Sequence, residues 1–213
     1  MRQDKTYGLV LIASSLVLLV MGLMHPDRLP ATREALEHTG LIAAIAHSLA
    51  IVGVWLTLWG LAGLSRFLGL ERPMVTGALA AFVMPAAAVT VAAALDGFAI
   101  PKLALQALDA EEATRHTMHS LIGFCVLVAS SLTRIYMLLG AVAIAMWSWV
   151  IREKQVSRGL PVLGATVALA AVGTAFGGPA YISVHVVLLL VLVQSAWMVW
   201  AGVMMIRRPP APL

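Results

Sequence analysis

Long apolar runs, separated by short polar clusters, extend along almost the whole chain. A membrane-spanning helix needs about 20 predominantly apolar residues, because each residue adds only about 1.5 Å along the helix axis. Six runs meet or approach this requirement, over residues 7–24, 41–64, 76–100, 121–150, 160–176 and 181–206. The pattern therefore predicts an all-α fold, a polytopic membrane helix bundle with six transmembrane helices.

The first and fifth runs each allow a second interpretation. Arg2 and Lys5 precede the first run as in a signal peptide, but no small-x-small cleavage site follows Met24, so we expect an uncleaved span. The fifth run is the shortest, and a Gly-Gly-Pro sequence at residues 177–179 follows it. If this run fails to cross the membrane, the C-terminus moves to the opposite side.

Composition supports a membrane protein and excludes several other classes. Hydrophobic residues make up 61% of the 213 residues and charged residues only 11%, whereas a soluble domain carries about 25% charged residues. The formal net charge is +4, but the cations stand in short clusters between apolar runs, so we expect lipid and not nucleic acid as the partner. Cys125 is the only cysteine, which excludes an intramolecular disulfide and a paired-cysteine metal site.

The charged residues between the runs predict the side of the membrane on which each loop lies. With the N-terminus inside, the inner side collects nine cations and three anions, whereas the outer side collects four cations and seven anions. Cytoplasmic loops are enriched in Lys and Arg, so this count places both termini in the cytoplasm. The nine inner cations are Arg2, Lys5, Arg66, Arg72, Arg152, Lys154, Arg158, Arg207 and Arg208.

We expect a single six-helix transmembrane domain over residues 1–208 and a disordered, Pro-rich tail at 209–213. The outer segments 25–40 and 101–120 carry alternating apolar and charged residues. This pattern predicts short helices that lie on the membrane surface.

All six histidines fall outside the membrane or in the outer third of a span, although they come from distant parts of the sequence. At about 1.5 Å per residue, His47, His119, His185 and Asp96 lie at similar heights on different spans. Three imidazoles are enough for a three-His metal site, and two for a bis-His haem, with Asp96 as a further ligand or as a group that orients one. Imidazole and carboxylate together suit zinc, copper or non-haem iron.

Arg134 lies within the fourth run, roughly 22 Å above its inner end at 1.5 Å per residue. An unpaired arginine at such a depth costs about 2.5 kcal/mol or more. One interpretation is a structural ion pair in which Arg134 extends toward Asp96. The other is binding of an anionic group, such as a carboxylate, a phosphate or a haem propionate, by the planar guanidinium. The sequence does not separate the two.

His25 and His116 are secondary candidates for the metal or haem site. His116 is spaced i, i+3 from His119 and so shares a helix face with it, but this spacing also fits a polar helix start. His25 precedes Pro26, and a residue before proline avoids the helical region, so this histidine also marks the end of the first helix. Each histidine taken singly is more often a solvated interfacial residue than a ligand.

Short stretches of the chain resemble those of uncharacterised six-helix bacterial inner-membrane proteins. The resemblance covers most of the chain and implies the same fold in a bacterial inner (plasma) membrane, with Arg134 where similar proteins carry a basic residue in the fourth helix. It implies no particular activity. The stretches are Met24-His-Pro26, Ala46-His-Ser48, Asp96-Gly-Phe98, Ala145-Met-Trp-Ser148 and Gly178-Pro-Ala-Tyr-Ile-Ser-Val-His185.

The leading hypothesis is a bundle that binds a metal ion or haem near its outer face and supports redox or metal-dependent chemistry. Its ligands are His47, His119 and His185, with Asp96 and Arg134 as supporting groups. The first alternative is a small-solute or ion permease, in which Arg134 and Asp96 line a pathway and the histidines relay protons. The second alternative is a structural or assembly subunit of a membrane complex, and a homo-oligomer is compatible with each hypothesis. The sequence does not decide whether the protein is an enzyme.

Overall fold

The computed structural model describes residues 2–26, 30–177 and 184–207, and these are almost entirely helical. Because α3, η1 and α4 run on as one helix, the described residues contain six helices that are long and apolar enough to cross a membrane. The predicted all-α class and the six spans are confirmed. The elements are α1 (Arg2–Met24), α2 (Arg33–Leu68), α3 (Pro73–Ala94), the π-helical turn η1 (Leu95–Ala99), α4 (Ile100–Asp109), α5 (Glu112–Glu153), α6 (Gly159–Gly177) and α7 (Val184–Arg207).

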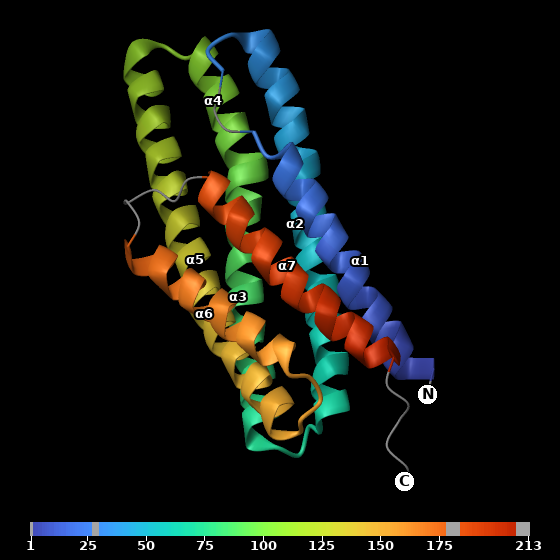
Figure 1. Ribbon diagram of the computed structural model, residues 1–213. Coiled ribbons are helices and arrows are strands. Elements are labelled where there is room, and N and C mark those ends of the chain that lie inside the picture. Colours follow the sequence, from blue (N-terminus) through green and yellow to red (C-terminus); the bar gives the residue numbers. More distant parts are fainter. Residues whose placement is uncertain (1, 27–29, 178–183, 208–213) are drawn as a thin grey trace.

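The helices form a ring around the axis of the bundle (Figure 1). Helix α1 packs against α2 and α7, α3 packs against α2 and α5, and α6 joins α5 to α7. Helix α1 begins and α7 ends at the same end of the bundle, which we call the terminal end (Figure 1). The opposite end, formed by Met24 of α1, Arg33 of α2, helix α4 and Glu112 of α5, is called the histidine end.

Helices α2, α4 and α5 extend beyond the other helices at the histidine end (Figure 1). The prediction of separate surface helices over 25–40 and 101–120 is wrong, because the described parts of both segments largely continue the spans. Leu36 and Ala107 are buried, whereas Leu108 is 40% exposed, so neighbouring helices cover only part of the apolar face of these segments. Arg33 strengthens this extension because it forms an ion pair with Asp109 at the end of α4.

The core of the terminal half is dense and aromatic. The rings of Trp147 and Trp197 lie 6.4 Å apart between centroids, and the indole N–H of Trp147 donates a hydrogen bond to Oγ of Ser65 at 3.0 Å. Glycines allow α1 and α7 to approach closely, because a Cβ at Gly8 or at Gly202 would lie 2.6 Å from the carbonyl oxygen of the other residue. This half of the bundle therefore acts as a fixed base for the histidine end.

The predicted fifth span is confirmed as the 19-residue helix α6. At about 1.5 Å per residue it is roughly 28 Å long, close to the thickness of the hydrocarbon layer. It is much shorter than the 42-residue α5 against which it packs, and it ends partway along that helix (Figure 1). Helix α6 therefore extends less far toward the histidine end than helices α2, α4 and α5 do.

Candidate metal-binding site

Two imidazoles and one carboxylate meet at the histidine end of the bundle. Nε2 of His25 and Nε2 of His47 each lie 3.2 Å from Oδ2 of Asp96. The two imidazole rings contact each other edge to face, with their centroids 4.9 Å apart. One ligand atom from each residue lies within 4.8 Å of the other two, which is close enough for all three to bind one metal ion. We call these three residues the His-His-Asp cluster.

The three members come from different elements and differ in exposure. His25 follows the last residue of α1, His47 lies within α2, and Asp96 lies in η1. The side chain of His47 is only 6% exposed and that of His25 is 20% exposed, whereas that of Asp96 is 41% exposed. The cluster thus has a buried imidazole at its base and a carboxylate that a ligand can reach.

The π-helical turn η1 accounts for the position of Asp96. Pro101, near the start of α4, has no N–H to donate to the carbonyl of Gly97, and its ring crowds the carbonyl four residues before it. The wider π turn accommodates this break while the helix continues, and such turns occur frequently at functional sites. Asp96 therefore lies in an irregular turn within an otherwise continuous helix from Pro73 to Asp109.

Gly97 allows η1 to lie directly against His47. A Cβ added at Gly97 would lie 2.4 Å from Cβ and 2.7 Å from Cγ of His47, closer than such atoms approach in proteins. Only glycine therefore fits here without a shift of η1 or of the imidazole. The Asp-Gly pair thus supplies both the carboxylate and the space for the ring that faces it.

The second ring nitrogen of each histidine is held by a backbone carbonyl. Nδ1 of His47 lies 2.8 Å from the carbonyl oxygen of Ala43, and Nδ1 of His25 lies 3.0 Å from the carbonyl oxygen of Pro26. A carbonyl oxygen only accepts hydrogen bonds, so each Nδ1 carries the proton. In a neutral imidazole, Nε2 is then unprotonated and presents its lone pair. In that state both lone pairs are directed at Asp96, whose carboxylate oxygen is itself an acceptor, whereas an imidazolium would donate a hydrogen bond to it from Nε2.

Three acceptor atoms that face one another require a cation between them, either a proton or a metal ion. Ligand atoms around an ion with bonds of about 2.0–2.1 Å are roughly 3.0 Å apart in an octahedron and roughly 3.3 Å apart in a tetrahedron. The observed Nε2–Oδ2 distance of 3.2 Å falls within this range. Charge-assisted N–H···O⁻ hydrogen bonds are shorter, at about 2.7–2.9 Å. Ordinary N–H···O hydrogen bonds also reach about 3.2 Å, so the spacing of the cluster is compatible both with a metal ion and with imidazoles that are protonated at Nε2.

A cavity of about 390 Å³ adjoins the His-His-Asp cluster, whose three side chains form part of its lining. The cavity lies inside the ring of helices, and all seven α-helices and η1 contribute to its walls. Most of these residues are apolar, for example Val89, Gly140, Ile144 and Val191. Apart from the cluster, the polar side chains in the lining are Thr90, Ser130, Thr133, Tyr136 and Gln194.

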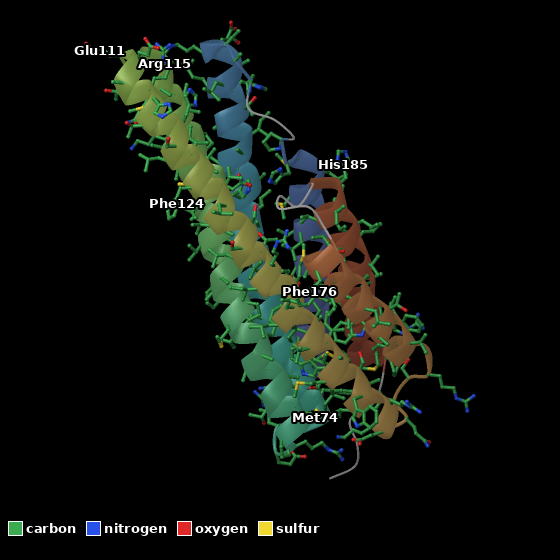
Figure 2. All side chains as sticks on the ribbon, turned by 90° about the vertical axis from the view of Figure 1, so that its left-hand side faces the viewer. Met74, Glu111, Arg115, Phe124, Phe176 and His185 are labelled. Atoms are coloured by element: carbon green, nitrogen blue, oxygen red, sulfur yellow. The ribbon has the colours of Figure 1, made fainter. Side chains whose placement is uncertain are left out.

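The structure brings together two of the ligands expected from the sequence, His47 and Asp96, but leaves the others apart from them. His119 has an exposed side chain on α5, and His116 is likewise exposed one turn earlier. His185 is exposed at the start of α7 (Figure 2). Of these three histidines, none belongs to the cluster. Its third member is His25, which the sequence offered only as a secondary candidate.

Arg134 lies at the end of α6. Its guanidinium donates a hydrogen bond of 2.7 Å to the carbonyl oxygen of Ala175, which belongs to the last turn of that helix and has no partner farther along it. The ion pairs found for Asp96 are those with His25 and His47. In the described structure Arg134 therefore stabilises a helix terminus, and the ion pair between Arg134 and Asp96, one of the two interpretations left open by the sequence, is not formed.

In the sequence, His25 is only a secondary candidate for a metal ligand, and its position in the chain explains why. Sequence reasoning ranked ligands by their height within a span, whereas His25 stands just after the end of α1. The adjacent Pro26 supplies the carbonyl that orients its ring. The His-Pro pair that ends the helix is therefore also the signal that could have identified this ligand.

Comparison of the chain with protein-family models, with curated proteins and with solved structures found no match.

Proposed function

We propose that this protein is a multi-pass protein of the bacterial inner membrane that binds one divalent transition-metal ion through His25, His47 and Asp96. The observation that carries the proposal is the anchoring of both Nδ1 atoms on backbone carbonyls. This anchoring turns the Nε2 atom of each imidazole toward Oδ2 of Asp96. Metal-binding histidines in proteins are held in the same way, with the second nitrogen donating to a carbonyl or carboxylate.

The ligand set narrows the choice of metal and of chemistry. Two imidazoles and one carboxylate suit zinc, iron(II) or copper. Sites with three protein ligands leave at least one coordination position for water or substrate, which is typical of catalytic rather than purely structural metal sites. Asp96 is accessible and the cluster borders the cavity, so the open position faces the cavity. The proposed chemistry is therefore metal-dependent and takes place at the cavity wall.

An ion fits the cluster better than haem. Axial imidazoles bind haem iron from opposite faces, with the macrocycle between them. The rings of His25 and His47 are in edge-to-face contact, and Oδ2 of Asp96 lies within 3.2 Å of both Nε2 atoms. A macrocycle between the two rings would have to separate them and displace the carboxylate.

The shape of the interior favours binding over permeation. Toward the terminal end the cavity reaches Ile144 of α5 and Gln194 of α7, and the Gln194 side-chain amide donates a hydrogen bond of 2.9 Å to the Tyr136 hydroxyl. Beyond them, Phe82, Trp147 and Trp197 are fully buried and pack in sequence. The interior of the terminal half is thus filled by side chains, which supports a binding pocket over a pathway.

Elemental analysis of the protein, purified in detergent without chelators, tests the proposal. We expect about one equivalent of zinc, iron or copper per chain, or uptake of one equivalent on titration with the metal alone. His25→Ala and His47→Ala should lose the metal, because each removes a ligand. His119→Ala and His185→Ala are the matched controls and should keep it, because both side chains are exposed and lie outside the cluster. Wild-type protein that neither contains nor takes up any of these metals would refute the proposal.

A further inference from the structure

We propose that the cavity beside the His-His-Asp cluster binds one long apolar chain of a membrane amphiphile whose oxygen-bearing headgroup lies against the cluster. This inference rests on the proposed metal site for the headgroup contact and extends it to a class of ligand. The chain-binding part follows from the cavity itself, and the two parts can be tested separately.

Polar side chains are unevenly distributed along the cavity. The His-His-Asp cluster is its most polar part, and the other walls are mainly aliphatic side chains from six spans. The hydroxyls of Thr90 and Thr133 donate to carbonyls of their own helices, at 2.8 Å to Ala86 and 2.9 Å to Ala129. These threonines therefore present little hydrogen-bonding capacity to a ligand.

Near the terminal end of the cavity, one polar pair already forms a hydrogen bond within the protein. The side-chain amide of Gln194 donates to the Tyr136 hydroxyl, and the Tyr136 ring packs edge to face on Phe82, with centroids 6.2 Å apart. A second polar end of a ligand would compete with this hydrogen bond, whereas the cluster offers two imidazoles and a carboxylate, and burying an unpartnered polar group is costly. An amphiphile with one polar end and one apolar end matches the cavity.

The helices leave space inside the ring. Across the described residues, no Cα atom of α5 lies within 8 Å of a Cα atom of α1 or α7. Gly140, on the cavity wall of α5, is buried, yet a Cβ added there would meet no atom within 4 Å. Close packing normally fills such space in protein interiors, and an apolar chain is the filler that this lining accepts.

The surroundings of the cavity and the charge of the proposed metal site both favour a lipid-like ligand with an oxygen-bearing headgroup. The cavity lies among helices that span the membrane, so the ligands at highest local concentration are lipid chains. One divalent ion held by two neutral imidazoles and one carboxylate leaves a net positive site, which favours an anionic or carbonyl oxygen in the open position. A fatty-acid carboxylate on a long chain is the simplest member of this class and serves as the probe.

Photo-crosslinking with palmitic acid that carries a diazirine near the end of its chain tests the chain-binding part. We expect cross-links to peptides that contain cavity residues, namely Val89 of α3, Ile144 of α5 and Val191 of α7, and competition by unlabelled palmitate. Gly140→Leu places a side chain in the open space and should reduce these cross-links at least roughly tenfold, as expected when a ligand site is filled.

Gly123→Leu is the matched control on the same helix. A Cβ at Gly123 also meets nothing within 4 Å, but this residue is exposed and does not line the cavity. Its cross-linking should equal that of the wild type. Labelling confined to outward-facing side chains such as Phe124 (Figure 2), or labelling of the cavity peptides that Gly140→Leu leaves unchanged, would overturn the chain site.

The headgroup part has its own measurement. Palmitate should compete with the probe at least roughly tenfold better than hexadecane in the wild type, and this preference should disappear in His47→Ala. Equal competition by both compounds in the wild type would overturn the headgroup contact. Metal analysis of the same samples distinguishes failure of this inference from failure of the proposed metal site. The Gly140→Leu variant should retain its metal. Cross-links to the cavity peptides in a wild-type protein that binds no metal would refute the metal site but not the chain site.

Discussion

Nε2 of His47 and Oδ2 of Asp96 lie 3.2 Å apart, although 49 residues separate the two positions along the chain. Helix α2 presents the imidazole from a regular helical turn, whereas the carboxylate comes from the π turn η1. The approach depends on Gly97, where any Cβ would collide with the His47 ring. The distance is thus set by two features of one short Asp-Gly segment, its irregular backbone and its missing side chain.

Asp96→Asn tests the carboxylate as a ligand. The substitution keeps the size of the side chain but replaces an anionic oxygen with a neutral amide, so we expect the metal affinity to fall at least roughly 10–100-fold. Titration of the purified variant with zinc measures this change. Asp109→Asn is the control, because Asp109 is exposed and its ion pair with Arg33 lies at the end of α4. Equal zinc affinity in the two variants would remove Asp96 from the ligand set.

Gly97→Ala tests the packing of η1 on His47. The added methyl group must displace the imidazole or η1, and overpacking of this kind costs about 1–3 kcal/mol of unfolding free energy. We expect a lower thermal unfolding temperature in detergent together with weaker metal binding. In Gly123→Ala the new methyl group meets no neighbour within 4 Å, and alanine is the better helix former by about 1 kcal/mol. This control should not lose stability, and a Gly97→Ala protein as stable as the wild type would contradict the packing argument.

Trp147→Phe tests the base of the bundle independently of the metal site. It removes the hydrogen bond to Ser65 and leaves a small void in a fully buried position, so we expect a loss of about 1–3 kcal/mol. Trp149→Phe changes an exposed residue on the same helix and should alter stability by no more than about 0.5 kcal/mol. Thermal unfolding measures both. Metal content should stay at the wild-type value in each variant, and its loss in Trp147→Phe would show that the two halves of the bundle are coupled.

The orientation inferred from the charges is tested by cysteine labelling. In a Cys125→Ser background, a cysteine at Glu111 should react with a membrane-impermeant maleimide on intact cells, because the positive-inside rule places the histidine end outside. A cysteine at Lys154 should react only after the membrane is permeabilised. Both positions are exposed, so access to the reagent depends on the membrane alone. The reverse labelling pattern would invert the topology and put the metal site near the cytoplasmic surface.

The outer segments show where sequence reasoning was partly successful. The alternation of apolar and charged residues around Leu36 correctly indicated amphipathic helix, but it did not identify the surface that the apolar face would contact. A lipid surface and a neighbouring helix are both apolar, so the same pattern fits either. The ion pair between Arg33 and Asp109, which are 76 residues apart, shows that the neighbouring helix α4 is the one used.

The sequence by itself determined the all-α class, the six spans and the concentration of histidines toward one end. Each spanning helix satisfies its own backbone hydrogen bonds and must be apolar over a fixed length, so these properties can be read from local composition. Only the tertiary structure decided that His25 joins His47 and Asp96 while His119 and His185 remain exposed. That choice depends on the rotation of each helix about its axis, on the π turn before Pro101 and on the close approach at Gly97. All three are set by contacts between residues distant in sequence, and height along a span contains no information about them.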